Sequence, residues 1–207
     1  MRELRELREV KVKVVTVLMM ASSTKKDDYI ETNSGNRVSR ASTLCGTQHI
    51  HLHGKSSIHQ GVVVRGDLAN VRIGRRCVIL PRTVIRPAWK RQVGKLIFLP
   101  STIGDNVIIE EDCVIQSTWI GSNVRIGKGC IVQARCVIKD CCYLLPGTVL
   151  PPDTVVAPFS VYGGTPGDFV EEMPECTPEM YEEVCMRASS LPFDAALLDE
   201  DIAVLAS

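Results

Sequence analysis

Aromatic side chains are scarce in this 207-residue chain, where Phe, Trp and Tyr together make up 5% of the residues. A core with so few rings must be built from small aliphatic side chains, which suits narrow, regular layers. The formal net charge is +0, which argues against a nucleic-acid binder. No stretch approaches the roughly 18–20 consecutive apolar residues of a membrane span, so we expect no direct membrane insertion.

Signals for disulfides and for cysteine-bound metals are also missing. The chain has 9 cysteines, an odd number, and no pair has the short CxxC spacing. Disulfide frameworks belong to small secreted chains, and this chain is neither very small nor clearly secreted. We therefore expect reduced cytosolic thiols that act as small hydrophobic side chains.

A period of six dominates the sequence from Ile73 onward. Between Ile115 and Ile120 one step of five interrupts it. Neither a helical period of 3.6 nor a strand period of 2 produces this pattern. The aliphatic positions are Ile73, Ile79, Ile85, Ile103, Ile109, Ile115, Ile120, Ile126, Val132, Ile138, Leu144, Leu150 and Val156.

Hexapeptide steps predict an all-β fold, a left-handed parallel β-helix in which three steps make one triangular coil. The large aliphatic residue points into the prism, and a small residue four positions later also points inward. Stacked coils supply each other's hydrogen bonds and buried surface. The same phase is visible at Leu52, Ile58 and Val64, so we expect the β-helix to begin near residue 44.

The small inward position explains most of the cysteines. A metal cluster or a redox pair would not account for cysteines that fall on the packing period, so we predict that these are buried structural thiols. Five of the nine occupy this position: Cys77, Cys113, Cys130, Cys136 and Cys142. The pattern assigns no role to Cys45, Cys141, Cys176 and Cys185.

Residues 87–102 break the repeat, and we expect either a loop that leaves one corner or an irregular coil. The period ends after Gly163-Gly164-Thr165-Pro166-Gly167. Thr177 and Pro178 then indicate the start of a helix over about 177–189, with threonine as the cap and proline in the first turn. The chain therefore divides into an N-terminal extension, residues 1–27; a β-helix domain, residues 28–167; and a C-terminal helix with an acidic tail, residues 168–207.

The N-terminal extension combines charged residues of both signs with an apolar stretch from Val12 to Met20. A transit peptide contains few acidic residues, and a signal peptide has a shorter charged region. We expect a disordered or loosely attached segment. A targeting role and a helix that packs on a partner are the alternatives.

Val64-Arg65-Gly66-Asp67, followed by Val71-Arg72-Ile73-Gly74, resembles the γ-class carbonic anhydrases, which share this fold. The resemblance implies that Arg65 and Asp67 belong to an inter-subunit and active-site network. The three histidine ligands of that family fall here on Arg86, Glu111 and Gln116. Because these side chains cannot replace three neutral imidazoles, and the guanidinium brings a permanent positive charge, we expect no metal.

Hexapeptide-repeat acyltransferases also share the fold, and the resemblance implies a histidine as general base. All four histidines, His49, His51, His53 and His59, lie near the N-terminus. The first three alternate, so on a strand they would share one face. That face is either a solvent-exposed polar surface or a small metal patch. Since no histidine occurs in the later coils, we do not expect acyl transfer.

Motifs outside the repeat carry a closer resemblance, to the dynactin subunit 5 family. It covers roughly residues 28–176. The matching segments are Tyr29-Ile30-Glu31-Thr32, Ser34-Gly35-Asn36, Val38-Ser39-Arg40, Leu44-Cys45-Gly46, Arg65-Gly66-Asp67-Leu68-Ala69-Asn70-Val71, Val84-Ile85-Arg86-Pro87, Glu110-Glu111-Asp112-Cys113, Lys139-Asp140-Cys141-Cys142 and Leu150-Pro151-Pro152.

The resemblance implies a non-catalytic scaffold at the pointed end of dynactin, in the cytoplasm and associated with the cytoskeleton. Its implied partners are a second hexapeptide-repeat subunit, an actin-related protein and dynein adaptors, which connect to membrane cargo in microtubule-based transport. It implies no enzyme activity and no cofactor. The alternatives are a hexapeptide-repeat acyltransferase, a γ-carbonic-anhydrase-like metalloenzyme and a free-standing structural homotrimer.

The candidate partner-binding residues lie in the interrupted segment and in the Arg-Gly-Asp motif. Aromatic and arginine side chains are enriched at interface hot spots, which favours a surface anchor in the interrupted segment. An equally plausible interpretation of Trp89 is a local cover over the prism edge. The residues are Arg65, Asp67, Trp89, Lys90, Arg91 and Phe98.

Overall fold

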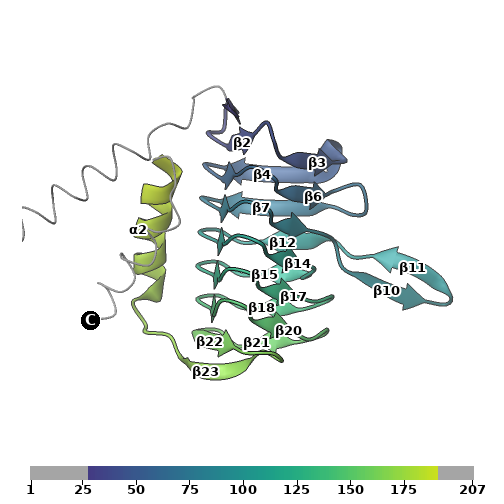
Figure 1. The fold of residues 1–207 in the computed structure, drawn as a ribbon, viewed down its shortest axis with the longest axis vertical. Helices are drawn as coiled ribbons and strands as arrows, with labels where there is room; N and C mark the ends of the chain where they lie inside the picture. The colour runs from purple at the N-terminus through teal and green to yellow at the C-terminus, as the bar shows by residue number, and fades with distance from the viewer. Residues whose placement is uncertain (1–27, 191–207) are drawn as a thin grey trace, which may run out of the picture.

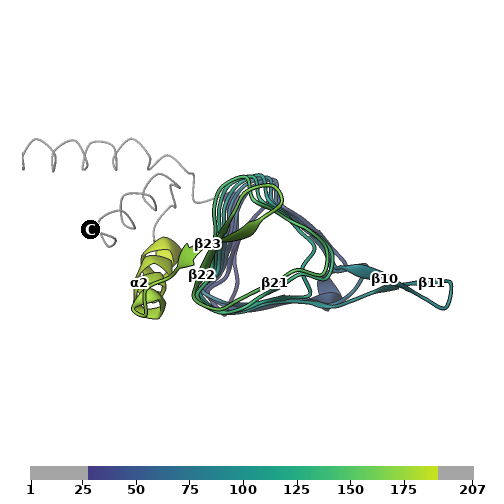
Figure 2. The ribbon, with the colours of Figure 1, turned by 90° about the horizontal axis from the view of Figure 1, so that it is seen from below.

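The computed structural model describes residues 28–190, with side chains to residue 186, so the predicted N-terminal extension and most of the acidic tail lie outside the described residues. Three parallel sheets form the sides of a triangular prism, seen end-on in Figure 2. A helix lies along one side, and a two-stranded ribbon projects from the opposite corner (Figure 1). The predicted left-handed parallel β-helix with a C-terminal helix is confirmed.

Sheet 1 is nine-stranded and lies under the helix. Its central strands are parallel, and an antiparallel strand closes it at each end, β1 on β2 and β23 on β22. Its members in spatial order are β1 (Tyr29–Glu31), β2 (Arg37–Ser39), β5 (Ser57–Ile58), β8 (Val78–Ile79), β13 (Ile108–Ile109), β16 (Arg125–Ile126), β19 (Tyr143–Leu144), β22 (Ser160–Gly163) and β23 (Asp168–Glu172).

Sheets 2 and 3 have six parallel strands each. Sheet 2 contains β3 (Thr43–Cys45), β6 (Val63–Arg65), β9 (Val84–Ile85), β14 (Val114–Ile115), β17 (Ile131–Val132) and β20 (Val149–Leu150). Sheet 3 contains β4 (Ile50–Gly54), β7 (Val71–Arg75), β12 (Ser101–Ile103), β15 (Trp119–Ile120), β18 (Val137–Ile138) and β21 (Val155–Val156). A short 3-10 helix, η2 (Thr47–His49), precedes β4.

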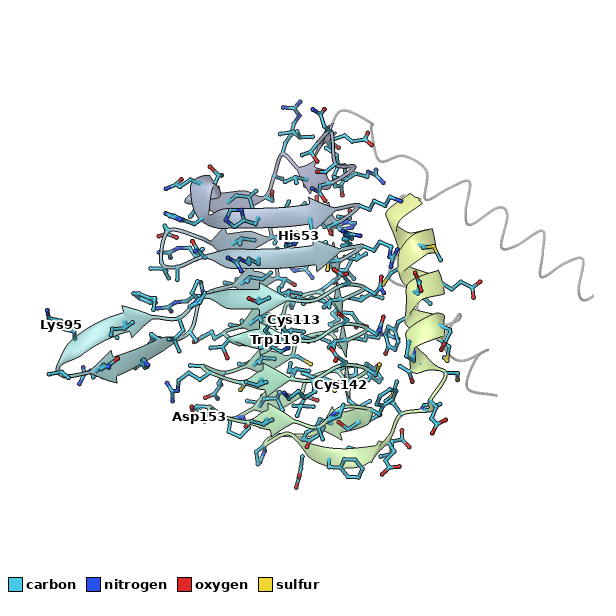
Figure 3. All side chains as sticks on the ribbon, turned by 180° about the vertical axis from the view of Figure 1, so that it is seen from behind. His53, Lys95, Cys113, Trp119, Cys142 and Asp153 are labelled. Carbon is cyan, nitrogen blue, oxygen red and sulfur yellow. The ribbon has the colours of Figure 1, made fainter. Side chains whose placement is uncertain are left out.

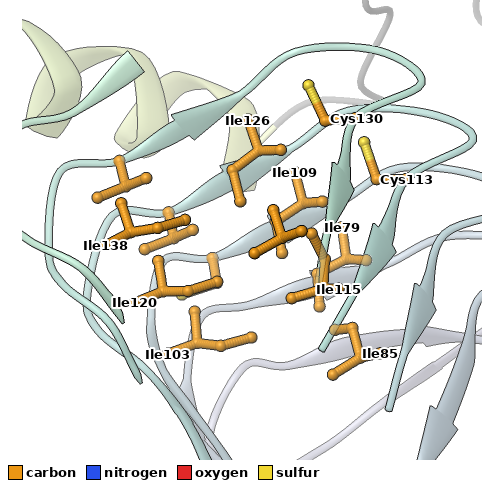
Figure 4. Close-up of a cluster of buried hydrophobic side chains, with 14 of the residues drawn as sticks. Ile79, Ile85, Ile103, Ile109, Cys113, Ile115, Ile120, Ile126, Cys130 and Ile138 are labelled. Carbon is orange, nitrogen blue, oxygen red and sulfur yellow. The ribbon is translucent and has the colours of Figure 1, made fainter. Parts of the chain in front are cut away.

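The prism interior is a column of stacked aliphatic side chains (Figure 4). Every aliphatic residue predicted to point inward between Ile73 and Val156 is at most 2% exposed, which confirms the period of six. Each such side chain stabilises the fold by about 1.5–3 kcal/mol. Inward aliphatic residues stack on the inward aliphatic residues of the neighbouring coils, and Ile115, for example, lies between Ile85 and Val132 in sheet 2.

The five cysteines predicted in the small inward position are buried, and all nine cysteines are free thiols. Their thiols donate to backbone carbonyls of the following coil, over 3.2 Å from Cys113 to Gly127 and 3.0 Å from Cys142 to Ala157. Burial raises the pKa of Cys142 to about 11, so the thiol keeps its proton at neutral pH. A cysteine therefore fills the narrow position and also satisfies a carbonyl.

The corners use left-handed backbone conformations. At the corner between sheets 3 and 1, Asn106 and Asn123 each have φ 55°, and the amide of Asn106 donates to the side-chain oxygen of Asn123 over 2.9 Å. A Cβ on the neighbouring Gly104 would lie 2.6 Å from Gly121 of the next coil, closer than real Cβ contacts. The corner asparagines thus adopt the left-handed backbone and bond to each other, while the close coil spacing requires glycine at position 104.

The β-helix begins one strand earlier than the sequence pattern suggested. We expected it near residue 44, but β2 already pairs in parallel with β5 and Val38 packs against the core. Val38 lies one hexad before Leu44, and the next step, from Leu44 to Leu52, is eight residues long. This irregular step hides the first hexad.

Helix α2 (Thr177–Ser190) agrees with the predicted helix and lies against the outer face of sheet 1. Tyr181, Val184 and Cys185 pack on Ile108, so α2 buries an outward position of the prism. Beneath it, Arg125 and Glu110 form a buried ion pair at 2.6 Å. Among residues 28–190, no helix is long and apolar enough to cross a membrane.

We predict that Ile126→Asp destabilises the protein by about 3–5 kcal/mol, because it buries a charge that has no partner in the prism. Thermal unfolding followed by circular dichroism measures the effect. Ile131→Asp is the matched control, since Ile131 lies on the outer side of sheet 2 and is 39% exposed. An Ile126→Asp variant that melts with the wild type would show that the inward assignment is wrong.

Candidate partner-binding surface

The positions that correspond to carbonic anhydrase ligands form no metal cage. Arg86 is exposed. The carboxylate of Glu111 forms ion pairs with the guanidinium of Arg82 at 2.9 Å and with the ammonium of Lys128 at 3.3 Å. Glu111 has the one carboxylate among these three side chains, and it is engaged by these two cations. Within the described residues, no group of three or more His, Cys, Asp or Glu side chains is placed to hold a metal ion.

The histidines do not gather into one site. His51 and His53 are exposed on β4, while Ile50 and Leu52 pack against the core. His49 lies in η2 rather than on the strand, because Gly46 takes a left-handed conformation and starts a helical turn. The prediction that three histidines share one face of a strand therefore holds only for His51 and His53. The Nδ1 of His53, labelled in Figure 3, is 3.0 Å from the carbonyl oxygen of Ile73.

His59 is buried, with its ring nitrogens 3.3 Å from the Tyr29 hydroxyl and 3.4 Å from the Ser57 hydroxyl. Burial, together with the positive charge of Arg37, lowers its pKa to about 4. The imidazole is therefore neutral at pH 7 and serves as a hydrogen-bonding core residue of the first coils.

The lowered pKa of His59 makes stability depend on pH. The unfolded chain, with an ordinary histidine pKa near 6.5, binds a proton before the folded protein does, so stability falls as pH drops from about 6.5 towards 4. The expected loss from this group between pH 7 and pH 4.5 is about 2 kcal/mol. Urea unfolding at pH 7 and at pH 4.5 measures it, and His59→Gln should lose less over the same interval. An equal loss in both proteins would contradict this assignment.

The interrupted segment forms a β-hairpin arm, made of β10 (Trp89–Gln92) and β11 (Lys95–Phe98). Its two-residue turn, Val93-Gly94, has positive φ at both positions, as a tight hairpin requires. The arm projects from the corner between sheets 2 and 3, on the side opposite α2 (Figures 1 and 2). The expected corner loop thus has regular structure of its own.

The arm is apolar as well as exposed. Val93 is 97% exposed, Leu96 53%, and Trp89 and Ile97 38% each. A two-stranded ribbon has no core beneath it and is marginally stable alone in water. Exposed apolar side chains on such a ribbon are typical of a surface that another molecule covers.

The root of the arm is fixed to the prism. The backbone N–H of Leu99 donates to Ala88 over 2.7 Å, and Arg135 donates to the carbonyl of Trp89 over 2.9 Å. Arg135 also binds both carboxylate oxygens of Asp153, which holds its guanidinium in place (Figure 3 labels Asp153). The backbone carbonyl of Trp89 is therefore tied to the prism through Arg135, while its side chain is partly exposed.

Arg65 ends β6 and Asp67 follows it at the same corner. Since Val64 pairs with Ile85, they lie one coil before the arm. They pair with each other through two hydrogen bonds of 2.8 Å. This pairing lowers the pKa of Asp67 and keeps the carboxylate charged. The structure thus brings all six predicted partner-binding residues to one corner of the prism.

Sequence reasoning missed a second exposed tryptophan. Trp119 is 48% exposed on the outer face of sheet 3, in register with Val137 of the next coil and Val155 of the one after. It occupies the position directly before the inward Ile120, and that position always faces outward. A tryptophan there was the available signal for a second apolar contact surface.

The fold defines the class of protein, a hexapeptide-repeat β-helix that presents a surface arm. Among solved structures, a hexapeptide transferase family protein from Anaplasma phagocytophilum has a TM-score of 0.59 and 23% identity, covering 76% of this chain and 90% of that one. The N-acyltransferase AntD from Bacillus cereus has a TM-score of 0.60 and 14% identity, covering 80% and 95%. At these identities the likeness shows the fold alone.

The chain belongs to the dynactin subunit 5 family, whose model matches residues 19–191. Dynactin subunit 5 of Dictyostelium discoideum is 52% identical over 76% of this chain and 80% of its own length. The mitochondrial gamma carbonic anhydrase 2 of Arabidopsis thaliana is a more distant relative, 28% identical over 57% of this chain and 42% of that protein. The resemblances stated from the sequence to both families are confirmed.

Proposed function

We propose that this chain is a non-catalytic scaffold subunit of the dynactin pointed-end complex. In this role it links dynein–dynactin to adaptors and membrane cargo during microtubule-based transport, in the cytoplasm and in association with the cytoskeleton. Membership of the dynactin subunit 5 family supports the assignment to dynactin. The arm carries the rest of the proposal, because it combines exposed apolar and basic side chains on a rigid support.

The proposed partners are a second hexapeptide-repeat subunit, an actin-related protein and dynein adaptors. Two properties of the prism support a scaffold with several contacts. Among residues 28–190, helix α2 covers the outer face of sheet 1, and outward side chains of sheets 2 and 3 such as Ile131 and Val155 are exposed. The arm then adds a contact point that extends beyond the flat faces.

We also propose that the protein has no enzymatic activity. In place of three imidazoles, the chain has Arg86, Glu111 and Gln116, and Glu111 is already engaged by Arg82 and Lys128. The carbonic anhydrase relative is the observation that keeps a hydratase as the second candidate.

Metal analysis of the purified protein separates the two candidates. We predict less than stoichiometric zinc after purification without chelators, because a zinc site of this fold needs neutral imidazole ligands. Glu111→Ala should leave the metal content unchanged. Stoichiometric zinc that is lost in a His51→Ala, His53→Ala double variant would instead support the enzyme.

The arm contact is tested with Trp89→Ala in affinity purification of the tagged chain followed by mass spectrometry. We predict a wild-type melting temperature and recovery of the actin-related and second hexapeptide-repeat subunits reduced by about tenfold or more, as at a hot spot. Phe159→Ala is the matched control, because it removes an exposed ring, 38% exposed like Trp89, that lies outside the arm and outside sheets 2 and 3. Recovery of self-trimers alone by the wild type would contradict the scaffold function, and normal recovery with Trp89→Ala would exclude the arm.

A further inference from the structure

The hairpin alternation leaves one edge of the arm free for hydrogen bonding. The N–H of Leu99 donates to the carbonyl of Ala88, so these two residues form a hydrogen-bonded pair. Hydrogen-bonded and non-hydrogen-bonded pairs alternate along an antiparallel ribbon, so the next pair towards the turn, Trp89 with Phe98, does not exchange hydrogen bonds. Continuing the alternation, Leu96 and Phe98 direct their backbone N–H and C=O away from β10. On the other edge, the carbonyl of Trp89 is already bonded to Arg135. Within residues 28–190, the outward backbone groups of β11 are therefore not engaged by another segment, whereas the β10 edge is engaged at its root.

The two faces of the arm differ in chemistry. Directly opposed residues share a face, so Trp89 and Phe98 lie on the same face as Arg91 and Leu96. This is the apolar face, and three of its four residues are aromatic or aliphatic. The other face contains Lys90, Gln92, Lys95 and Ile97. A strand added along β11 would extend both faces and cover the flanks of Leu96 and Ile97.

The charge of the arm selects the chemistry of its partner. Between Arg86 and Asp105 the chain contains Lys90, Arg91 and Lys95 and no acidic residue. None of these three cations forms a salt bridge among the described residues of the chain. A complementary segment therefore has acidic side chains, with apolar residues between them.

We propose that β11 binds an extended, acidic and partly apolar segment of a partner protein, which adds to the arm as a third strand. Backbone hydrogen bonds to Leu96 and Phe98 supply affinity, and side-chain alternation supplies specificity. The third strand also gives the ribbon the width that an independent sheet requires. This inference rests on the proposed scaffold function, because it takes the arm as a partner contact.

The test uses the full chain and two synthetic peptides, one in which glutamate alternates with valine and phenylalanine, and its lysine counterpart. Fluorescence anisotropy at low and high salt should show binding of the acidic peptide only, weakened by salt. Leu96→Pro removes an outward N–H without breaking a hydrogen bond to β10, so it should weaken binding about tenfold beyond Leu96→Ala. Arg91→Pro and Arg91→Ala, on the opposite edge, should differ little.

Failure of the acidic peptide to bind, or equal affinities for Leu96→Pro and Leu96→Ala, would overturn strand addition. If these results coincided with loss of dynactin subunits in the Trp89→Ala purification, the scaffold function would stand and only the third strand would be excluded. The acidic edge strand β23 of a second copy is the competing occupant. Concentration-dependent self-association in sedimentation, abolished by Glu171→Lys with Glu172→Lys, would overturn the partner in favour of that copy.

Discussion

Each coil of the prism depends on the coils before and after it for its hydrogen bonds and for its buried surface. Val114 donates its N–H to Cys130 of the next coil over 2.9 Å, while Ile115 fills the space between Ile85 and Val132. No coil can move alone without breaking ladders on both sides, so the stack is a rigid support. Function in such a fold must come from what the corners and outer faces present.

The corners tolerate insertions because the ladder resumes in register after them. Eighteen residues separate Ile85 from Ile103, where the period needs six, yet Ile103 pairs with Ile73 as if nothing intervened. The extra residues leave as the arm, and Arg135 fixes its root to a later coil. The same rigidity that specifies the core therefore holds an exposed ribbon at a defined position, which is what a scaffold contact requires.

The sequence predicted the buried positions correctly where a residue type at a given place in the repeat fits only the prism interior. An isoleucine at every sixth position, or a cysteine four positions later, fits only the interior, and these positions are buried. The arm was harder to predict, because its two strands do not alternate strictly between polar and apolar residues. For example, Lys90 lies opposite Ile97 on the same face. The hydrogen bond from Arg135 to the root of the arm joins residues far apart in sequence and depends on coil register, which a single-sequence pattern does not supply.

Amide hydrogen–deuterium exchange tests most directly the claim that the rigid prism presents the arm to a partner. The comparison is between the isolated chain and the chain within the assembled pointed-end complex, read out peptide by peptide. We predict that residues 89–98 exchange rapidly in the isolated chain and become protected on assembly, while the stacked strands around Ile109 and Ile126 are protected in both. Unchanged exchange of residues 89–98 on assembly would contradict it.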